Sequence, residues 1–213
     1  TERNYESFNF AHSTYKEKKG GKGIGRFVWL RAFTKVEIES QYPENAKFFY
    51  RKFTFEPTKN GIENHSCKEV DGIKNRFTEV RLKGLKSDYQ KWCNTNAEDI
   101  AIKIIEHCFE FFLRDDCPRT TLHDGNKKTV VNDLFGVFTK GQVISIPLKI
   151  RQERFEVNIA KLYSTKLDNK IHYCAHTREV ENDKMNEEIP ELDTFICDEN
   201  GHKFCVAAYV SGT

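Results

Sequence analysis

Residues 20–33 read Gly-Gly-Lys-Gly-Ile-Gly-Arg-Phe-Val-Trp-Leu-Arg-Ala-Phe, so four glycines lead straight into an apolar segment with helical spacing. Glycine lets backbone N–H groups approach phosphate oxygens closely, and a helix N-terminus adds a partial positive charge at the same point. Lys22 and Arg26 would add full positive charges. The pattern therefore predicts a phosphate-binding, glycine-rich loop that is followed by a helix.

Two common nucleotide motifs do not fit this loop. A P-loop needs a glycine five residues before a Gly-Lys-Ser/Thr sequence, but Lys16 stands at that first position and Gly23 stands where the hydroxyl belongs. A dinucleotide-binding turn needs the spacing G-x-G-x-x-G after a buried strand. Here the spacing is G-x-G-x-G, and the preceding residues are polar. What remains is a glycine-rich lid that is anchored by the helix downstream.

The segments around this loop resemble the GHKL ATPases, which include gyrase, the ninety-kilodalton heat-shock chaperones, histidine kinases and MutL. Residues 11–16 resemble the hydroxyl-rich, lysine-ending segment upstream of the family's lid, and residues 21–27 resemble its second glycine box. Residues 36–40 are similar to the strand that follows the lid helix. The resemblance extends over about residues 5–135 and is strongest to prokaryotic stand-alone proteins of the family, with Hsp90-like and MutL-like ATP-binding regions.

The resemblance implies an α/β (α+β) fold, a two-layer sandwich of a mixed sheet and helices known as the Bergerat fold. Residues 77–82 stand where the family has a strand whose threonine helps to hold the nucleotide, although Phe77 replaces the usual glycine there. The implied ATP-binding residues are Lys16, Gly20, Gly21, Lys22, Gly23, Ile24, Gly25, Arg26 and Thr78.

The resemblance also implies that part of the family pattern lies outside these 213 residues. We find neither the D-x-G-x-G box that reads adenine nor the earlier helix that carries the Mg²⁺-binding Asn and the catalytic acid. We therefore expect a fragment that lacks an N-terminal part. Residues 1–138 would be the C-terminal part of the ATPase domain, and residues 139–213 would begin a second, transducer-like α/β domain. Residues 174–180 are similar to a strand end of the MutL transducer, with Arg178 at its arginine position.

The function that the resemblance implies is a nucleotide-gated molecular clamp, which binds ATP with Mg²⁺ and hydrolyses ATP in the intact protein. We expect the 213 residues alone neither to hydrolyse ATP nor to bind it tightly. The alternative is a degenerate GHKL scaffold that binds a protein or nucleic-acid partner without turnover. A homodimer and a protein or DNA client are both compatible with the sequence, which assigns no catalytic residue.

Composition limits the classes of partner. The sequence has 34 Lys and Arg against 32 Asp and Glu, a net charge of +2, so no strong basic field points to non-specific DNA binding. No apolar run approaches membrane-spanning length, so we expect no membrane partner. Seven cysteines at irregular spacing argue against a disulfide framework and indicate a reducing cytoplasm.

Hydrophobic periodicity predicts the order of the elements. We expect the lid helix to bury Val28, Trp29, Ala32 and Phe33, and a second helix at residues 96–113 to begin with a capping box of Thr95 and Glu98. That second helix should bury a stripe of residues: Ile100, Ala101, Ile104, Ile105, Cys108, Phe109, Phe112 and Leu113. Strands are expected at residues 35–40, 47–56, 75–85, 119–123, 143–150, 155–164, 170–175, 194–197 and 203–210.

The sequence does not favour zinc binding or catalysis by a cysteine. Five residues of the types that zinc prefers occur late in the chain, namely Cys174, His176, Cys197, His202 and Cys205. Their spacing matches no common finger or ribbon, so we expect no bound metal. Neighbouring His107 and Cys108 point in different directions on a helix, so the sequence does not indicate a nucleophilic cysteine either.

Overall fold

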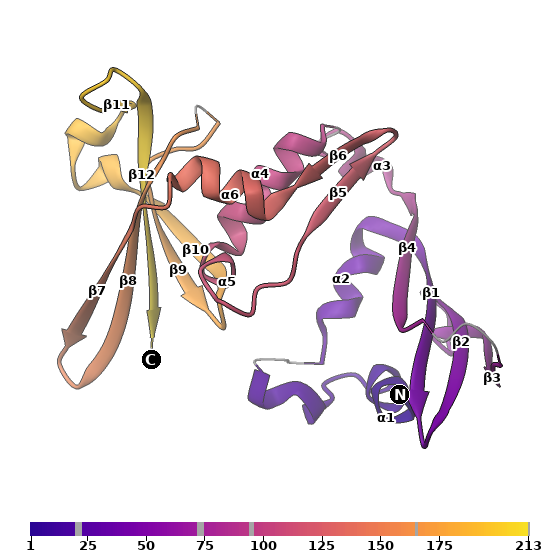
Figure 1. Cartoon of the computed structure of the whole chain (residues 1–213). Helices are drawn as coiled ribbons and strands as arrows, with labels where there is room; N and C mark the ends of the chain where they lie inside the picture. The colour runs from indigo at the N-terminus through magenta and orange to yellow at the C-terminus, as the bar shows by residue number, and fades with distance from the viewer. Residues whose placement is uncertain (20–22, 72–74, 94–95, 165, 213) are drawn as a thin grey trace. The chain divides into compact units, whose positions relative to one another are not determined.

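The computed structural model describes residues 1–19, 23–71, 75–93, 96–164 and 166–212. They form two compact units, Thr1–Cys93 and Asn94–Thr213, each built from helices and a β-sheet (Figure 1). The chain is therefore of the mixed α+β class, as predicted. Within the described ranges, no helix combines the length and the apolar character that crossing a membrane requires.

The first unit contains a four-stranded antiparallel sheet in the order β3-β2-β1-β4. Its strands are β1 (Phe33–Glu44), β2 (Lys47–Phe55), β3 (Ile62–Glu69) and β4 (Phe77–Leu85). A two-residue turn joins β1 to β2, and both of its residues, Asn45 and Ala46, have positive φ angles of 53° and 63°. Such a turn matches the right-handed twist of the strands that it connects.

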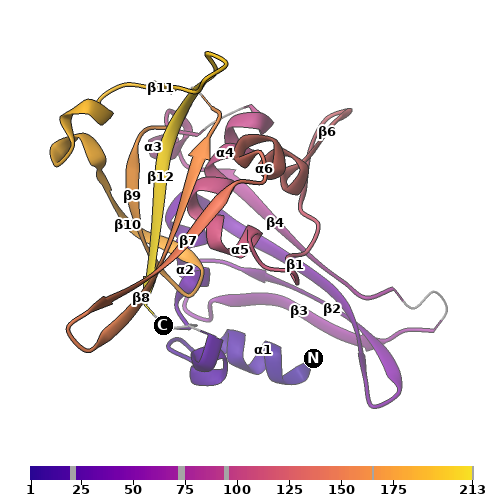
Figure 2. The ribbon, with the colours of Figure 1, turned by 60° about the vertical axis from the view of Figure 1, so that its left-hand side comes forward.

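One face of this sheet forms the core of the first unit. Alternation along β1 and β2 places Val36, Ile38, Phe53 and Phe55 on the same face, where all four are buried. Figure 2 shows two helices of this unit, α1 (Glu2–Asn9) and α2 (Gly25–Ala32), each of eight residues. Their side chains that pack on this face are Tyr5, Phe8, Trp29 and Leu30. Between the helices lies the short 3₁₀ helix η1 (Thr14–Lys19). A short helix α3 (Ser87–Gln90) follows β4.

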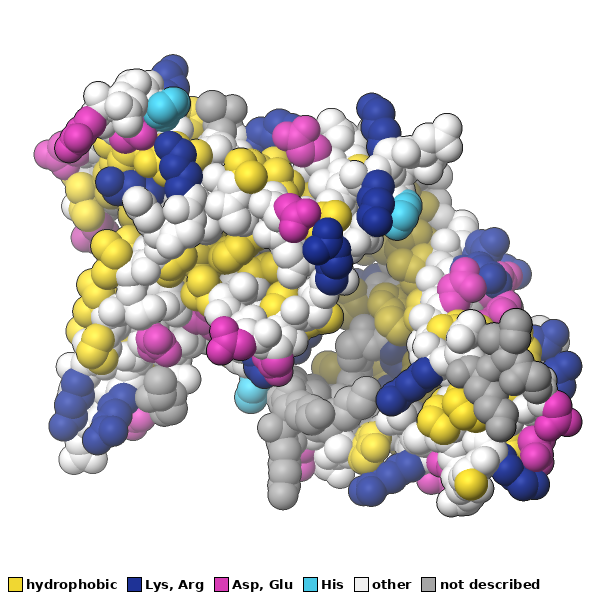
Figure 3. Space-filling model, viewed as in Figure 1, with side chains coloured by type: hydrophobic (Ala, Val, Ile, Leu, Met, Phe, Trp, Pro, Cys, Tyr) yellow, Lys and Arg dark blue, Asp and Glu magenta, His cyan; other side chains and the backbone are white. Residues whose placement is uncertain are grey.

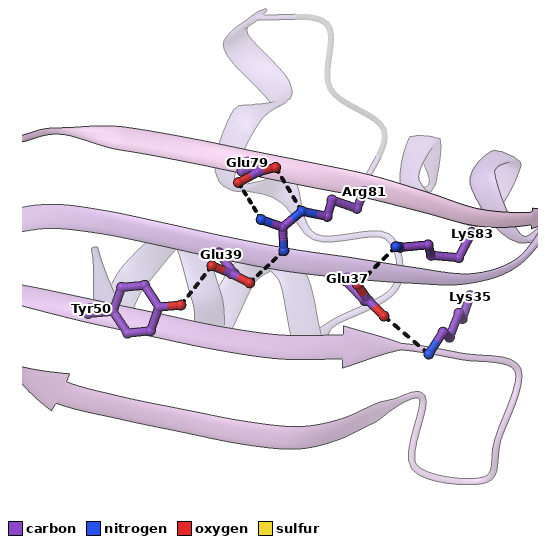
Figure 4. A network of polar contacts seen from close by, with 7 residues as sticks. All are labelled: Lys35, Glu37, Glu39, Tyr50, Glu79, Arg81 and Lys83. Atoms are coloured by element: carbon purple, nitrogen blue, oxygen red, sulfur yellow. Dashed lines mark hydrogen bonds and ion pairs between the residues drawn. The ribbon is translucent and has the colours of Figure 1, made fainter.

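The opposite face of the sheet is polar. Figure 4 shows its ion pairs, in which Arg81 contacts both Glu39 and Glu79 at 2.7 Å and Glu37 lies between two lysines. Tyr50 Oη donates to Glu39 at 2.7 Å. All these side chains reach solvent in part, so the network is a solvated surface that contributes little stability per pair.

The second unit contains a mixed sheet in the order β10-β9-β12-β8-β7, in which β12 runs parallel to β9 and antiparallel to β8. Short strands β5 and β6 form a separate hairpin, and β11 pairs with β12. The strands are β5 (Thr121–Asp124), β6 (Lys127–Val130), β7 (Val143–Ile150), β8 (Glu153–Leu162), β9 (Lys170–Ala175), β10 (Arg178–Lys184), β11 (Ile196–Cys197) and β12 (Lys203–Gly212). The helices are α4 (Ala97–His107), α5 (Phe109–Phe112), α6 (Val131–Thr139), η2 (Met185–Glu187) and η3 (Pro190–Leu192).

Helices α4, α5 and α6 supply the core of the second unit together with one face of its sheet. The ring of Tyr209 is fully buried and is stacked between Phe109 and His172, with centroids 4.1 Å and 4.3 Å away. The other face carries half-exposed apolar side chains along the edge strand β7, at Ile144, Ile146, Leu148 and Ile150. Figure 3 shows hydrophobic side chains at the surface of this unit.

This packing differs from the predicted domain boundary after Phe138. Phe109, Val131 and Phe138 share one core with strand residues such as Leu162 and Tyr209, so the helices belong to the same compact unit as the sheet that follows. The division into units falls between Cys93 and Asn94 instead. The identity of the two parts as an ATPase domain and a transducer-like domain stays a prediction.

The predicted second helix is present but divided. Asn96, rather than Thr95, caps it, since the Asn96 side chain accepts from the N–H of Glu98; Thr95 lies outside the described residues. Cys108 leaves the helical conformation with φ −117° and ψ 26°, which separates α4 from α5. Ile102 is buried in place of the predicted Ile100, which is 36% exposed.

Candidate functional site

Helix α2 begins at Gly25, as predicted, and the two described glycines at its start differ in their surroundings. Gly23 has a φ of +69°, and a Cβ atom there would lie 2.2 Å from the backbone N of Ser13. Gly25 begins α2 and has nothing within 4 Å of the same position. Close backbone contact therefore requires glycine at residue 23 and not at residue 25. Gly20, Gly21 and Lys22 lie outside the described residues.

The other predicted residues of the lid have defined places. Ile24 is the N-cap of α2, contributes no side-chain cap and is 40% exposed. Arg26 turns back and donates from Nη1 to the carbonyl of Gly23 at 2.7 Å. Its guanidinium also lies over the rings of Phe8 and Phe27, and burial lowers its pKa. Lys16 lies in η1, and the structure does not describe its side chain.

No residue of α2 is fully buried, and the side chains that pack against the core differ in part from the prediction. Trp29 packs against the core, as expected from its spacing, and Leu30 packs beside it. Val28 is 60% exposed, although it was predicted to be buried. The helix spans only eight residues, so its apolar contacts come from fewer than three turns.

A cavity of about 380 Å³ lies on the apolar face of the sheet in the first unit. Thr78 lines it from β4, opposite Ser40 of β1, and Trp29 lines it from α2. The remaining walls come from α1, the strands and the residues just before α1 and β4: Thr1, Asn4, Tyr5, Phe8, Ile38, Gln41, Tyr42, Pro43, Arg51, Phe53, Arg76, Phe77 and Val80. Two elements whose sequences resemble nucleotide-binding segments, the lid helix and the strand of Thr78, thus line one cavity.

The cavity has the mixed character of a small-molecule site. Aromatic and aliphatic side chains form much of its wall, and a few hydroxyl, amide and guanidinium groups interrupt them. Its volume falls within the common range for ligand pockets, roughly 300–1,000 Å³. The cavity wall thus offers aromatic side chains, Trp29 and Phe8 among them, and a hydroxyl group at Thr78.

Sequence reasoning missed Arg51, which is the most deeply buried charged residue of this wall. Its side chain is 3% exposed, and Nη2 pairs with Glu2 and lies 3.5 Å from Cys67 Sγ. Burial disfavours its charge, but the hydrogen bonds to Glu2 and Cys67 outweigh that cost and raise its pKa. The sequence pattern that could have predicted its burial is Phe49, Arg51, Phe53 in one strand. Because side chains alternate between the faces of a strand, this pattern places the charge of Arg51 on the same face as the two phenylalanines.

Cysteine and histidine side chains of the second unit are separated by their packing. Cys205 is buried and Cys174 is half-buried, and burial raises the pKa of each thiol to about 12. His202 contacts Asp198 at 3.3 Å on the surface. Among the residues that the structure describes, no three His, Cys, Asp or Glu side chains form a group that could hold a metal ion, so Mg²⁺ has no assigned ligand there.

No family model and no curated protein matches this sequence. Among solved structures, the chain is similar to the ATPase domain of Thermus thermophilus gyrase B bound to an aminocoumarin, with a TM-score of 0.48 and 10% identity over 97% of this chain and 60% of the other. The ATPase region of Saccharomyces cerevisiae topoisomerase II matches with a TM-score of 0.46 and 10% identity over 98% of this chain and 58% of the other. Gyrase B of Myxococcus xanthus matches with a TM-score of 0.41 and 9% identity over 86% and 58%.

The chain thus spans about 60% of the length of the solved structures that it matches. At 9–10% identity the likeness concerns the course of the backbone and gives no residue a role.

Proposed function

We propose that the cavity of the first unit is part of an ATP-binding site. One observation carries the proposal: Thr78 and Trp29, from two segments that resemble GHKL nucleotide-binding elements, line the same cavity. The adenine ring would lie on the apolar face of the sheet beside Thr78. The phosphates would extend toward the N-terminus of α2, where unsatisfied N–H groups favour anions.

The loop at residues 20–26 would act as a lid. Phosphates would stabilise the closed position of the loop through contacts that the open position lacks, which is the requirement for a ligand to shift a conformational equilibrium. Gly23 would let the backbone turn beside the segment that contains Ser13. We propose that closure couples to the second unit as a clamp, with Mg²⁺-dependent hydrolysis and dimer formation as the further steps.

Nuclear magnetic resonance titration of the ¹⁵N-labelled chain with ATP tests the proposal residue by residue. We expect weak binding, about millimolar, because the adenine-reading carboxylate is not among these residues. The amide signals of Gly23 and of residues 25–29 and 78–80 should shift. Replacement of Thr78 by Val should weaken binding about threefold to tenfold by removing one hydrogen bond.

Thr54 offers a matched control for Thr78. It lies on β2 opposite Glu37, on the polar face of the same sheet, so Thr54→Val should leave the ATP titration unchanged. An ATP titration that shifts none of the signals from Gly23, Trp29 or Thr78 would contradict the proposal. That outcome would favour the scaffold without nucleotide binding.

A further inference from the structure

Arg51 is a buried cation on the face of the sheet that carries most of the apolar side chains of the first unit. Strand β2 places it in the same alternation as Phe53 and Phe55, and its side chain is only 3% exposed. Burial of a charge is costly unless the group is paired and hydrogen-bonded. The hydrogen-bond partners of the Arg51 guanidinium therefore determine whether it is a satisfied structural group or can bind a ligand.

The described residues satisfy only part of the guanidinium. Nη2 pairs with the carboxylate of Glu2 from α1, whereas the buried Nε and Nη1 have no hydrogen-bond partner. The rings of Tyr5 and Tyr42 lie 4.3 Å and 5.5 Å from the guanidinium carbon. Ring faces stabilise the charge, but they provide no acceptor for the N–H groups in the guanidinium plane.

The single carboxylate partner is loosely held. Glu2 is 54% exposed and lies in the first turn of a helix that has no fully buried residue. Arg51 also lines the cavity described above, beside Asn4 and Ser40. Arg76 adds a second cation to that wall. A buried cation with unused donors thus adjoins a cavity, and an accessible side chain serves as its counter-ion.

The geometry of a guanidinium restricts how a ligand could use these donors. Nε and Nη1 lie on either side of Nη2, so a two-oxygen contact must include Nη2 together with one of its neighbours. The two N–H groups of Nη2 already have partners, the Glu2 carboxylate and Cys67 Sγ at 3.5 Å. An oxyanion that makes a bidentate contact with Arg51 must therefore displace one of these two partners, and we expect it to displace Glu2, because the negative charge of Glu2 competes with that of the anion.

We propose that Arg51 binds an oxyanion, a phosphate or a carboxylate, that enters through the cavity, and that Glu2 is the internal counter-ion that this anion displaces. The inference adds an anion contact on β2 to the proposed phosphate contacts at α2, and it does not depend on the ligand being ATP. The anion is either free or carried by a larger molecule in the cavity. Both sources present the same chemistry to Arg51.

Titrations of the full chain with inorganic phosphate, AMP and adenosine test the inference by the amide shifts of Tyr5, Arg51 and Cys67. Glu2→Gln should bind phosphate about fivefold more tightly, because the competing charge is gone. Arg51→Lys should bind it at least about fivefold more weakly, because an ammonium is a point charge without the planar fork. Arg81→Lys and Glu39→Gln, on the polar face of the same sheet, are the matched controls and should bind as the unsubstituted chain does.

The three ligands distinguish the two sources of the anion. If inorganic phosphate binds and its binding depends on Arg51, the site takes a free anion. If AMP binds whereas inorganic phosphate and adenosine do not, the site takes an anion that is carried by a larger molecule. If Glu2→Gln gains nothing and a folded Arg51→Lys chain binds phosphate and AMP as before, the inference is wrong. The proposed ATP site can be wrong while this inference holds. In that case ATP would shift no amide signal at Gly23 or Thr78, whereas the binding of phosphate would still depend on Arg51.

Discussion

Gly23 and Ser13 touch through their backbones: a Cβ atom on Gly23 would lie 2.2 Å from the Ser13 nitrogen. Ser13 is itself held by a hydrogen bond of 2.8 Å between its hydroxyl and that of Ser7 in α1. The glycine of the lid is therefore also a packing residue. This contact connects the start of α2 to the segment that follows α1.

Replacement of Gly23 by Ala should destabilise the first unit. The positive φ alone costs an L-residue at least about 1 kcal/mol, and the contact with Ser13 adds to it. Gly25→Ala should leave stability unchanged or raise it by up to about 1 kcal/mol, because Ala is the better helix former and meets no atom there. Urea unfolding of the two variants checks this, and equal midpoints would contradict it.

The sequence alone predicted the parts of the fold that depend on local periodicity. The limits of β7 and β9 were predicted to the residue, and the lid helix was predicted from Gly25 onward. The break at Cys108 was not, because the apolar stripe continues through it and only packing separates α4 from α5.

The site was predictable only in part for a similar reason. Residues 20–33 and Thr78 carry recognisable patterns, but the role of Arg51 depends on a helix that lies 42 residues or more earlier in the chain, at Glu2–Asn9. Such long-range pairing leaves no local signal. The predicted burial of Val28 failed because the short α2 presents Leu30 to the core instead.

Thiol reactivity should follow burial in the chain. The thiolate is the reactive form, and burial raises the pKa of Cys174 and Cys205 to about 12, so both should react slowly with Ellman's reagent at pH 8. Cys67, Cys93 and Cys197 are exposed and should react first. Mass spectrometry of partly labelled protein identifies the order, and early labelling of Cys205 would show that the β12 packing is wrong.

Purified protein should contain far less than one zinc ion per chain. The thiol of Cys205 lies against the carbonyl of Leu162 and that of Cys174 lies near the carbonyl of His172, so neither faces a shared ligand position. Elemental analysis measures the metal content. Stoichiometric zinc that is lost on replacement of Cys197 or His202 by Ala would restore the metal-site hypothesis.

The second unit should lose stability as the pH falls below about 6.5, because His172 is buried in its neutral form. Burial lowers the pKa of His172, although the carboxylates of Glu179 and Glu106 oppose the shift. The unfolded chain, with its ordinary histidine pKa of about 6.5, then binds the proton more readily than the folded chain does. The stabilisation is complete above that pH and declines below it by at most about 1.4 kcal/mol per pH unit.

Urea unfolding of the chain and of His172→Phe at pH 7.5 and 5.5 measures this dependence. Phenylalanine keeps a ring against Tyr209, so the variant should retain the stacked core and lose part of the pH dependence. His202→Phe is the matched control, because that side chain is 62% exposed and contacts only Asp198 among the ion pairs of the described residues. A pH dependence that is the same in all three proteins would mean that His172 is not the group whose protonation destabilises the second unit.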